Sequence, residues 1–184
     1  MARPARVLTV CGSPSADSRT AAVLAVTARS LEEAGHETVA LHLRDLPAAA
    51  LLHADFQAPA LRHAAELVEW ADALIVGTPV YKAAYTGLLK AWLDLLPQRA
   101  LAGKTVLPLA TGGSPAHTLV LDYALRPVLV SMAASHIAQG CFLLDQAVTR
   151  GPAPTLEPEA RTRLDRATAG LLDALPDPVV VSAA

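Results

Sequence analysis

The segment GSPSADSRT, residues 12–20, gathers groups that bind anions in many proteins. Hydroxyl side chains come from Ser13, Ser15, Ser18 and Thr20, and Arg19 supplies a fixed positive charge. A helical pattern begins at this point, and the first turn of a helix offers unpaired backbone N–H groups and a partial positive charge. The segment therefore predicts a socket for a phosphate monoester. In the plainer interpretation, Ser18 only caps the helix and Arg19 faces water.

Other phosphate chemistries do not match this segment. It contains neither the G-x-x-x-x-G-K-[ST] pattern of ATP and GTP loops nor the G-x-G-x-x-G pattern of dinucleotide sites. A cysteine phosphatase would leave five residues between its cysteine and its arginine, whereas seven lie between Cys11 and Arg19. The arginine position of that pattern is occupied by Asp17, an anion that would repel phosphate. We therefore expect Cys11 to be a small buried strand residue.

The segment PVYKAAYTG has the residue types of a turn beside a flat ring. Pro79 stiffens the turn, and Val80 and Tyr81 can present backbone amides and an aromatic edge to a ring. Lys82 and Tyr85 are placed to reach a second ligand. The alternative is a turn whose two tyrosines lie at an interface.

The segment TGGSPAH, residues 111–117, contains two adjacent glycines. Paired glycines free the backbone to bond with the polar edge of a ligand. His117 opens the next helix, although a single histidine is more often structural than catalytic. One phosphate socket and two backbone-rich loops together predict a slot for a phosphorylated planar cofactor, and FMN fits it best.

These segments lie between strands and helices that alternate along the chain. The expected strands are residues 6–11, 37–43, 72–78, 104–111 and a stretch within 135–144, and the expected helices are 19–34, 59–71, 86–96, 116–132 and 157–175. A Pro/Ala loop is expected between the second strand and second helix. Strict alternation predicts a doubly wound parallel sheet, in which ligands bind beyond the carboxyl ends of the strands. The three segments follow the first, third and fourth strands.

The composition limits the classes of protein that remain. The 184 residues, 53% of them hydrophobic, predict one domain over residues 1–176 and a loose tail over 177–184. A net charge of -2 gives no footprint for nucleic acid, and no apolar run is long enough to span a membrane. Two cysteines make no disulfide framework, so a cytoplasmic location is expected, and we assign no metal site. The high apolar content also favours a homo-oligomer.

In this order and at these spacings, GSPSADSRT, TPVYKAAYTGLLKAWLDLLPQRAL, GKTVLPLATGGSPAH and LDYALRPVL resemble the NADPH-dependent FMN reductases. The strongest resemblance is to the reductase component of two-component alkanesulfonate monooxygenase systems, and it extends from Val7 to Leu171. It implies a flavodoxin-like three-layer α/β/α fold with five parallel strands in the order 2-1-3-4-5. It also implies that NADPH or NADH reduces FMN and that reduced FMN leaves for a partner flavin-dependent monooxygenase in sulfur assimilation.

The resemblance also implies roles for single residues. When the family's roles are transferred by position, Ser13, Ser18, Arg19 and Thr20 would hold the FMN phosphate. Pro79, Val80 and Tyr81 would line the isoalloxazine ring. Thr111, Gly112 and Gly113 would bind the polar edge of the ring. Nicotinamide or interface contacts are expected at Lys82, Tyr85, His117 and Tyr123. We assign no catalytic acid or base, because in hydride transfer to flavin the cofactors carry the chemistry and the protein positions them.

A proline interrupts the helix expected over residues 116–132. Pro127 cannot donate a hydrogen bond to the carbonyl of Tyr123, so the helix should kink or contain a π-bulge there. The resemblance places a π-helical segment at this point, at a subunit interface beside the flavin site. We therefore expect a homodimer or homotetramer in which Tyr123 packs across the interface and affects flavin release.

Two other functions fit the same fold. One is a reductase that keeps its FMN and reduces quinones or azo dyes, since fold alone does not decide function. The other is a flavodoxin-like electron carrier without enzymatic activity. Carriers of that kind are strongly acidic to steer redox partners, and the net charge of -2 argues against one.

Overall fold

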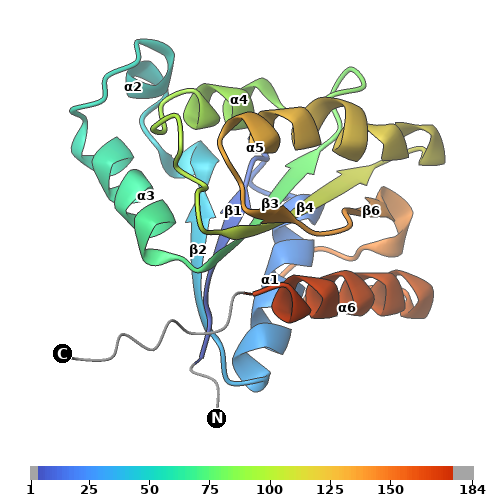
Figure 1. Cartoon of the computed structure of the whole chain (residues 1–184). Helices are drawn as coiled ribbons and strands as arrows, with labels where there is room; N and C mark the ends of the chain where they lie inside the picture. Colours follow the sequence, from blue (N-terminus) through green and yellow to red (C-terminus); the bar gives the residue numbers. More distant parts are fainter. Residues whose placement is uncertain (1–3, 176–184) are drawn as a thin grey trace, which may run out of the picture.

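The computed structural model describes residues 4–175, which form a parallel sheet with helices on both faces (Figure 1). The strands are β1 (Arg6–Cys11), β2 (Glu37–His42), β3 (Ala73–Pro79), β4 (Thr105–Gly112), β5 (His136–Ile137) and β6 (Cys141–Leu144). Their order is β2-β1-β3-β4-β5, and β6 also pairs with β4. The flavodoxin-like fold and the strand order are confirmed. The predicted loose tail lies outside the described residues.

The fifth position of the sheet is divided between β5 and β6. β5 pairs with the start of β4, where Thr105 lies opposite His136, and β6 pairs with its end, where Gly112 lies opposite Leu144. Gly140 lies at the break, and a Cβ on it would come within 3.0 Å of a Leu121 side-chain carbon. A glycine in a strand often marks such a close approach, and here it lets the edge strand pass under the helical segment above it.

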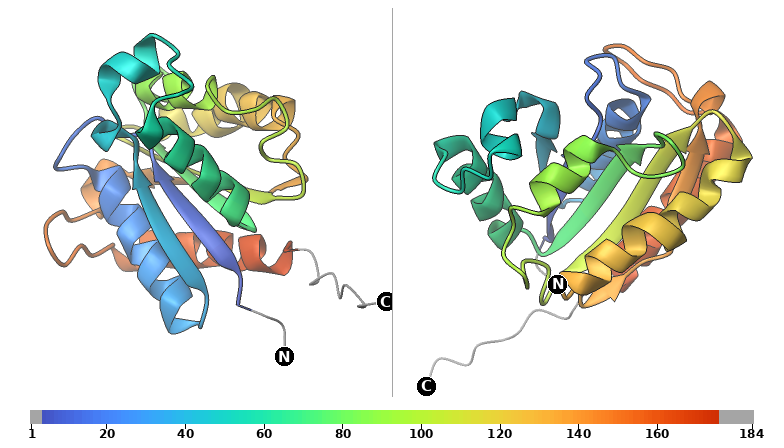
Figure 2. Two further views of the ribbon diagram at one scale, coloured as in Figure 1. Left: turned by 90° about the vertical axis from the view of Figure 1, so that its left-hand side faces the viewer. Right: turned by 90° about the horizontal axis from the view of Figure 1, so that it is seen from above.

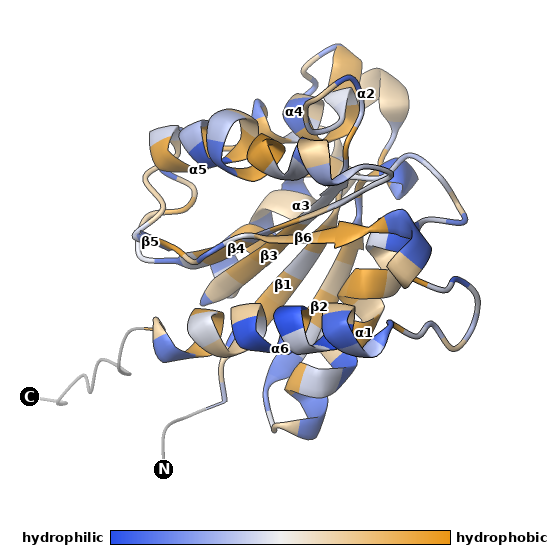
Figure 3. Cartoon of the chain, turned by 90° about the vertical axis from the view of Figure 1, so that its right-hand side faces the viewer, coloured by the Kyte–Doolittle hydropathy of each residue, from blue (hydrophilic) through white to orange (hydrophobic). Residues whose placement is uncertain are grey.

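The helices are α1 (Arg19–Glu33), α2 (Ala48–Leu52), α3 (Pro59–Trp70), α4 (Gly87–Leu93), α5 (Arg126–Ser131) and α6 (Pro158–Asp173). α1 and α6 cover one face of the sheet, and α3, α4 and α5 cover the other (Figures 1 and 3). Alternate strand residues point to opposite faces, which divides the core in two. On β1, Leu8 and Val10 belong to one cluster, and Val7 and Cys11 belong to the other.

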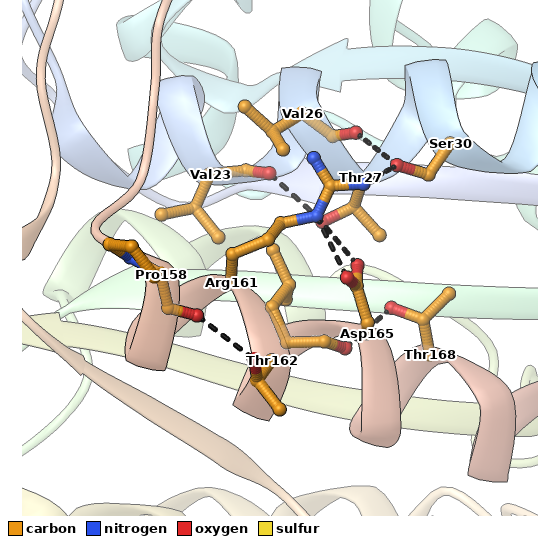
Figure 4. Close-up of polar contacts among 10 residues, drawn as sticks. Val23, Val26, Thr27, Ser30, Pro158, Arg161, Thr162, Asp165 and Thr168 are labelled. Atoms are coloured by element: carbon orange, nitrogen blue, oxygen red, sulfur yellow. Dashed lines mark hydrogen bonds and ion pairs between the residues drawn. The ribbon is translucent and has the colours of Figure 1, made fainter.

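α1 is held in place by α6. Figure 4 shows Arg161 of α6 between the two helices, where its Nη2 donates to Ser30 Oγ of α1 at 3.0 Å. Its Nε donates to both carboxylate oxygens of Asp165 in the next turn of α6, at 2.8 and 2.9 Å. Beneath this polar edge, Leu164 and Leu171 are buried against the sheet. The contact therefore joins α6 to the carboxyl-terminal part of α1, away from the first turn, where the predicted phosphate socket lies.

The helical segment predicted over residues 116–132 is divided into three parts. The segment consists of a 3-10 helix η2 (Pro115–Leu119), a π-helix η3 (Leu121–Leu125) and α5. The kink or π-bulge predicted from Pro127 is confirmed, because the proline has no N–H to continue the α-helical pattern and the preceding turn widens.

Two smaller predictions also change. The expected strand over 37–43 ends at His42, and a 3-10 helix η1 (Leu43–Asp45) follows it. The expected Pro/Ala loop contains α2, since the residues AAALL after Pro47 have high helix propensity. Within residues 4–175, no helix has the length and apolar character needed to cross a membrane.

Candidate active site

The loop between β1 and α1 is shaped by its own hydroxyl groups. Ser18 caps α1, because its Oγ accepts a hydrogen bond from the Ala21 N–H at 3.2 Å. Ser13 is 2% exposed, and its Oγ accepts from the Ser15 N–H at 3.3 Å. The plainer interpretation of Ser18 as a helix cap is therefore correct, although capping does not prevent its hydroxyl from meeting a ligand as well.

Arg19 does not behave as the plainer interpretation required. Its side chain is half-buried, and its Nε is fully buried without a hydrogen-bond partner. A buried guanidinium N–H without a partner is costly, and such atoms commonly mark a place where a ligand or ion completes the site. The orphaned donor lies in the first residue of α1, where the backbone N–H groups also favour an anion. The site therefore fits a phosphate group.

Thr20 in the first turn of α1 and Thr111 near the end of β4 are in direct contact. Their hydroxyls are hydrogen-bonded to one another at 2.7 Å, and both residues are almost completely buried. Thr20 was predicted at the phosphate and Thr111 at the ring. The structure brings the two residues together below the loops, so a ligand would have to share these hydroxyls with the existing bond.

Gly12 and Thr86 join the first and third strand ends. Thr86 Oγ1 donates to the Gly12 carbonyl at 2.6 Å and accepts from the Leu89 N–H at 3.1 Å, which makes it the cap of α4. A Cβ on Gly12 would lie 2.9 Å from Leu89 Cβ, so only glycine fits. Sequence reasoning missed Thr86. A threonine directly before a helical pattern is a signal for a helix cap, but its long-range bond to Gly12 has no sequence signal.

The turn after β3 corrects one prediction. Val80 and Tyr81 were expected to offer backbone amides to a flat ring, but the Val80 N–H donates to the Thr111 carbonyl at 2.9 Å and the Tyr81 N–H donates to the Ala84 carbonyl at 2.9 Å. Both φ angles between Tyr81 and Ala84 are positive, 52° at Lys82 and 62° at Ala83, as in a tight I′ hairpin. β4 takes the Val80 amide and the hairpin takes the Tyr81 amide, so contacts of these two residues to a ring must come from their side chains.

The paired glycines differ in their surroundings: Gly112 ends β4 in a crowded place, and Gly113 follows it at the surface. A Cβ on Gly112 would be 3.2 Å from the Phe142 ring and 3.4 Å from Nδ1 of His117. That Nδ1 is buried and has no hydrogen-bond partner, the second orphaned side-chain nitrogen among the described residues. A Cβ on Gly113 would be 3.9 Å from Oδ2 of Asp145. Phe142 and Asp145 were missed, because they belong to the edge strand and its following turn, far along the sequence.

The remaining predicted residues are more dispersed. Pro79 is half-buried at the end of β3, and Tyr81 is 49% exposed. Lys82 is exposed at the tip of the hairpin, while Tyr85 is half-buried against the core. Tyr123 lies on the π-helix and is 79% exposed. Its side chain therefore faces outward, and within a single chain it does not lie among the three loops at the carboxyl ends of the strands.

Cys11 has the character expected of a structural residue. It is 2% exposed at the end of β1, and burial raises the pKa of its thiol. A nucleophilic cysteine needs the opposite, a lowered pKa. A hollow of about 560 Å³ elsewhere, lined by Cys141, Phe142 and Arg163 among others, runs between β6 and α6 at the sheet edge and is not lined by the residues of the three loops.

Comparison with known proteins shows the family to which the chain belongs. The family model described as NADPH-dependent FMN reductase matches residues 5–149. The chain belongs to this family. It is therefore an oxidoreductase, and the matched residues include all three loops that converge at the carboxyl ends of the strands.

Individual relatives agree with the family assignment. The chain is 51% identical to an FMN reductase (NADPH) of Pseudomonas putida over 142 residues, 77% of this chain and 72% of the relative. It is 47% identical to an FMN reductase (NADPH) of Escherichia coli over 163 residues, 88% of this chain and 85% of the relative. A further Pseudomonas putida relative, named NADH-dependent FMN reductase SfnE, is 39% identical over 77% of this chain and 78% of the relative.

Solved structures agree on the fold. The apo form of an NADH:FMN oxidoreductase (EMOB) superposes with a TM-score of 0.84 at 42% identity, covering 94% of this chain and 90% of that one. An archaeal flavodoxin superposes with a TM-score of 0.64 at 12% identity, covering 92% and 98%. The second likeness concerns the fold alone.

Proposed function

We propose that this chain reduces FMN with NAD(P)H and that reduced FMN then leaves for a partner flavin-dependent monooxygenase. The observation that carries the proposal is the buried, unpartnered Nε of Arg19 at the first turn of α1. This nitrogen gives the chain a hydrogen-bond donor suited to the phosphate group that distinguishes FMN from riboflavin. Family membership supports the reaction, and the more similar relatives, named for NADPH, favour NADPH over NADH.

The phosphate would be held by Ser13, Ser18, Arg19 and Thr20. Because the hydroxyls of Ser18 and Thr20 already take part in hydrogen bonds within the chain, Arg19 and the N-terminal amides of α1 supply most of the positive potential. Charge-assisted hydrogen bonds are about twice as strong as neutral ones. Arg19 is therefore the residue on which selectivity for FMN depends most.

The ring would lie between the hairpin after β3 and the glycines after β4. Side chains of Pro79, Val80 and Tyr81 would cover one side, and Thr111, Gly112 and Gly113 would meet the polar edge. When bound, FMN supplies hydride acceptance and the nicotinamide supplies the hydride. The protein positions the two molecules and excludes water from the slot.

His117 is suited to the polar edge of the ring. A neutral imidazole nitrogen can either donate or accept a hydrogen bond, and Nδ1 of His117 is buried beside Gly112 without a partner. It can therefore fix the orientation of the ring edge. Lys82, exposed at the hairpin tip, would contact the phosphates of NAD(P)H, and Tyr85 would support the hairpin from the core side.

The oligomer would form along the π-helix. Leu119, Tyr123 and Val130 follow one another along the segment from η2 to α5 and are 61%, 79% and 60% exposed. Such a line of large apolar side chains is typical of an interface. We propose a homodimer or homotetramer in which Tyr123 reaches across this interface and influences flavin release. Alkanesulfonate oxidation as the partner's reaction rests on the resemblance of the sequence segments.

The test is an absorbance spectrum of the purified protein, followed by NADPH oxidation with increasing FMN. The proposal predicts a nearly colourless protein whose NADPH oxidation rises with FMN and saturates. A protein that retains FMN through purification and needs a quinone or azo dye for turnover is a bound-flavin reductase. A protein that holds FMN and never oxidises NADPH is an electron carrier. Either result would refute the proposal.

A further inference from the structure

The predicted phosphate loop contains one carboxylate, Asp17, directly before Ser18 and Arg19. An ionised carboxylate so near the socket would repel a phosphate group. In the structure Asp17 is not alone: its Oδ2 lies 2.7 Å from Nη1 of Arg150, and the same Nη1 donates to the Asp17 carbonyl at 3.4 Å. The two residues are 133 positions apart in the chain. Figure 2 shows the loops that carry them, blue and orange, at the same end of the molecule.

Arg150 lies in a turn that is closed by hydrogen bonds between Thr149 and Thr155. The Thr149 N–H donates to the Thr155 carbonyl at 2.9 Å, and the Thr155 N–H donates to Thr149 Oγ1 at 2.7 Å. Val148 and Leu156 form an antiparallel bridge just outside these threonines, and Val148 is buried in the core. These bonds close the turn that carries Arg150, and the Arg150 side chain reaches from it to Asp17 of the phosphate loop.

This ion pair differs from the helical pairs of the molecule. Lys90 with Asp94, Arg126 with Asp122, and Arg161 with Asp165 each join residues four positions apart. Pairs of that kind contribute little beyond local helix stability. The Asp17–Arg150 pair connects the phosphate loop to a separate part of the fold, so its charge acts where a ligand would bind.

We propose that Arg150 is a positioning residue for the flavin phosphate: it neutralises Asp17 and holds the outer side of the phosphate loop. The inference rests on the proposed function, because it takes the ligand to be a phosphate monoester. Without Arg150, the free carboxylate of Asp17 would oppose the phosphate dianion. Without Asp17, Arg150 would be free to add its own charge to the socket.

The test compares the affinity for FMN with that for riboflavin, which lacks the phosphate. The proteins are wild type, Arg150→Gln, Asp17→Asn and the double variant, each measured by flavin fluorescence at low salt. Arg150→Gln should weaken FMN binding about threefold to tenfold, the range expected for one uncompensated exposed charge, and leave riboflavin unchanged. Asp17→Asn should bind FMN at least as tightly as wild type. The double variant should return close to wild type, because neither charge remains.

Arg161→Gln is the matched control, since it removes an arginine from another exposed ion pair, on α6 (Figure 4), and should not change FMN affinity. Thermal unfolding of each variant checks that it folds. An Arg150→Gln variant that binds FMN as wild type does, or that loses FMN and riboflavin equally, would overturn the inference and leave the proposed function intact. A wild-type protein that binds no FMN would overturn both.

Discussion

Among single residues, Arg19 has the strongest predicted effect on the binding of FMN, because its buried Nε has no hydrogen-bond partner within the chain. Replacing Arg19 by Ala should raise the Kd for FMN about tenfold to a hundredfold, the effect of losing a hydrogen bond to a charged group, with little effect on riboflavin. The flavin-free variant should unfold at the same temperature as wild type or slightly higher, because an unpartnered buried donor is removed.

Arg29→Ala on the exposed side of α1 serves as the control for charge and helix composition. Its FMN affinity should equal that of wild type. Fluorescence titration measures both constants. Equal losses for FMN and riboflavin in Arg19→Ala would place the arginine away from the phosphate.

The two thiols provide a second prediction at this scale. Burial raises the pKa of Cys141 to about 11 and also raises the pKa of Cys11. Both thiols are therefore neutral at pH 8, and iodoacetamide should label the folded protein slowly and the denatured protein fully. For Cys141, the folded state favours the protonated thiol, so this contribution to stability is present below pH 9 and is lost as the pH rises towards 11. Rapid labelling of Cys11 in the folded protein would contradict this account.

At the scale of elements, Thr86 connects two strand ends and one helix. Thr86→Val keeps the shape of the side chain but leaves the Gly12 carbonyl and the Leu89 N–H without their partner. The loss of a cap and of a buried hydrogen bond should reduce the free energy of unfolding by about 2–4 kcal/mol. Urea denaturation measures the change.

Thr162→Val is the control for this experiment. Its hydroxyl donates to the Pro158 carbonyl on the exposed first turn of α6, so its loss should change stability by less than about 0.5 kcal/mol. FMN affinity should fall in Thr86→Val and stay unchanged in Thr162→Val. Equal stability of the two variants would show that Thr86 does not hold the loops together.

The sequence predicted the helices and strands better than the contacts between them. Apolar runs and prolines located the strands and most helices, and Pro127 predicted the widened turn before it. Local patterns could not predict the break at Gly140, which depends on Leu121 passing above the strand. They also could not predict that the Val80 amide is bonded to Thr111 of β4 and the Tyr81 amide to Ala84 of the hairpin.

In the candidate site, residues that are adjacent in the chain could be predicted, and contacts between distant residues could not. Ser13, Ser18 and Arg19 were predicted because a helix start, hydroxyls and a cation are adjacent in the chain. The Thr20–Thr111 bond and the Asp17–Arg150 pair join residues that only the folded sheet brings together. The neutralisation of Asp17 by an arginine from a distant loop follows no periodic pattern and no motif, so it can be recognised only in the structure.

At the scale of the whole molecule, the exposed line of Leu119, Tyr123 and Val130 predicts assembly. Tyr123→Ala should shift the protein towards a smaller oligomer, because the largest exposed side chain of that line is lost. Light scattering after gel filtration measures the mass. Leu52→Ala, on the exposed end of α2, is the control and should leave the mass unchanged. A Tyr123→Ala protein with unchanged mass and unchanged flavin affinity would remove the case for this interface.

Release of the flavin after its reduction separates the proposed function from that of a reductase that keeps its flavin. The most direct measurement is rapid anaerobic gel filtration of the protein after reaction with NADPH and a small excess of FMN. If the flavin is released, reduced FMN will elute as a small molecule, separate from the protein. Reduced FMN that elutes with the protein would contradict release, and would make the chain a reductase that keeps its flavin.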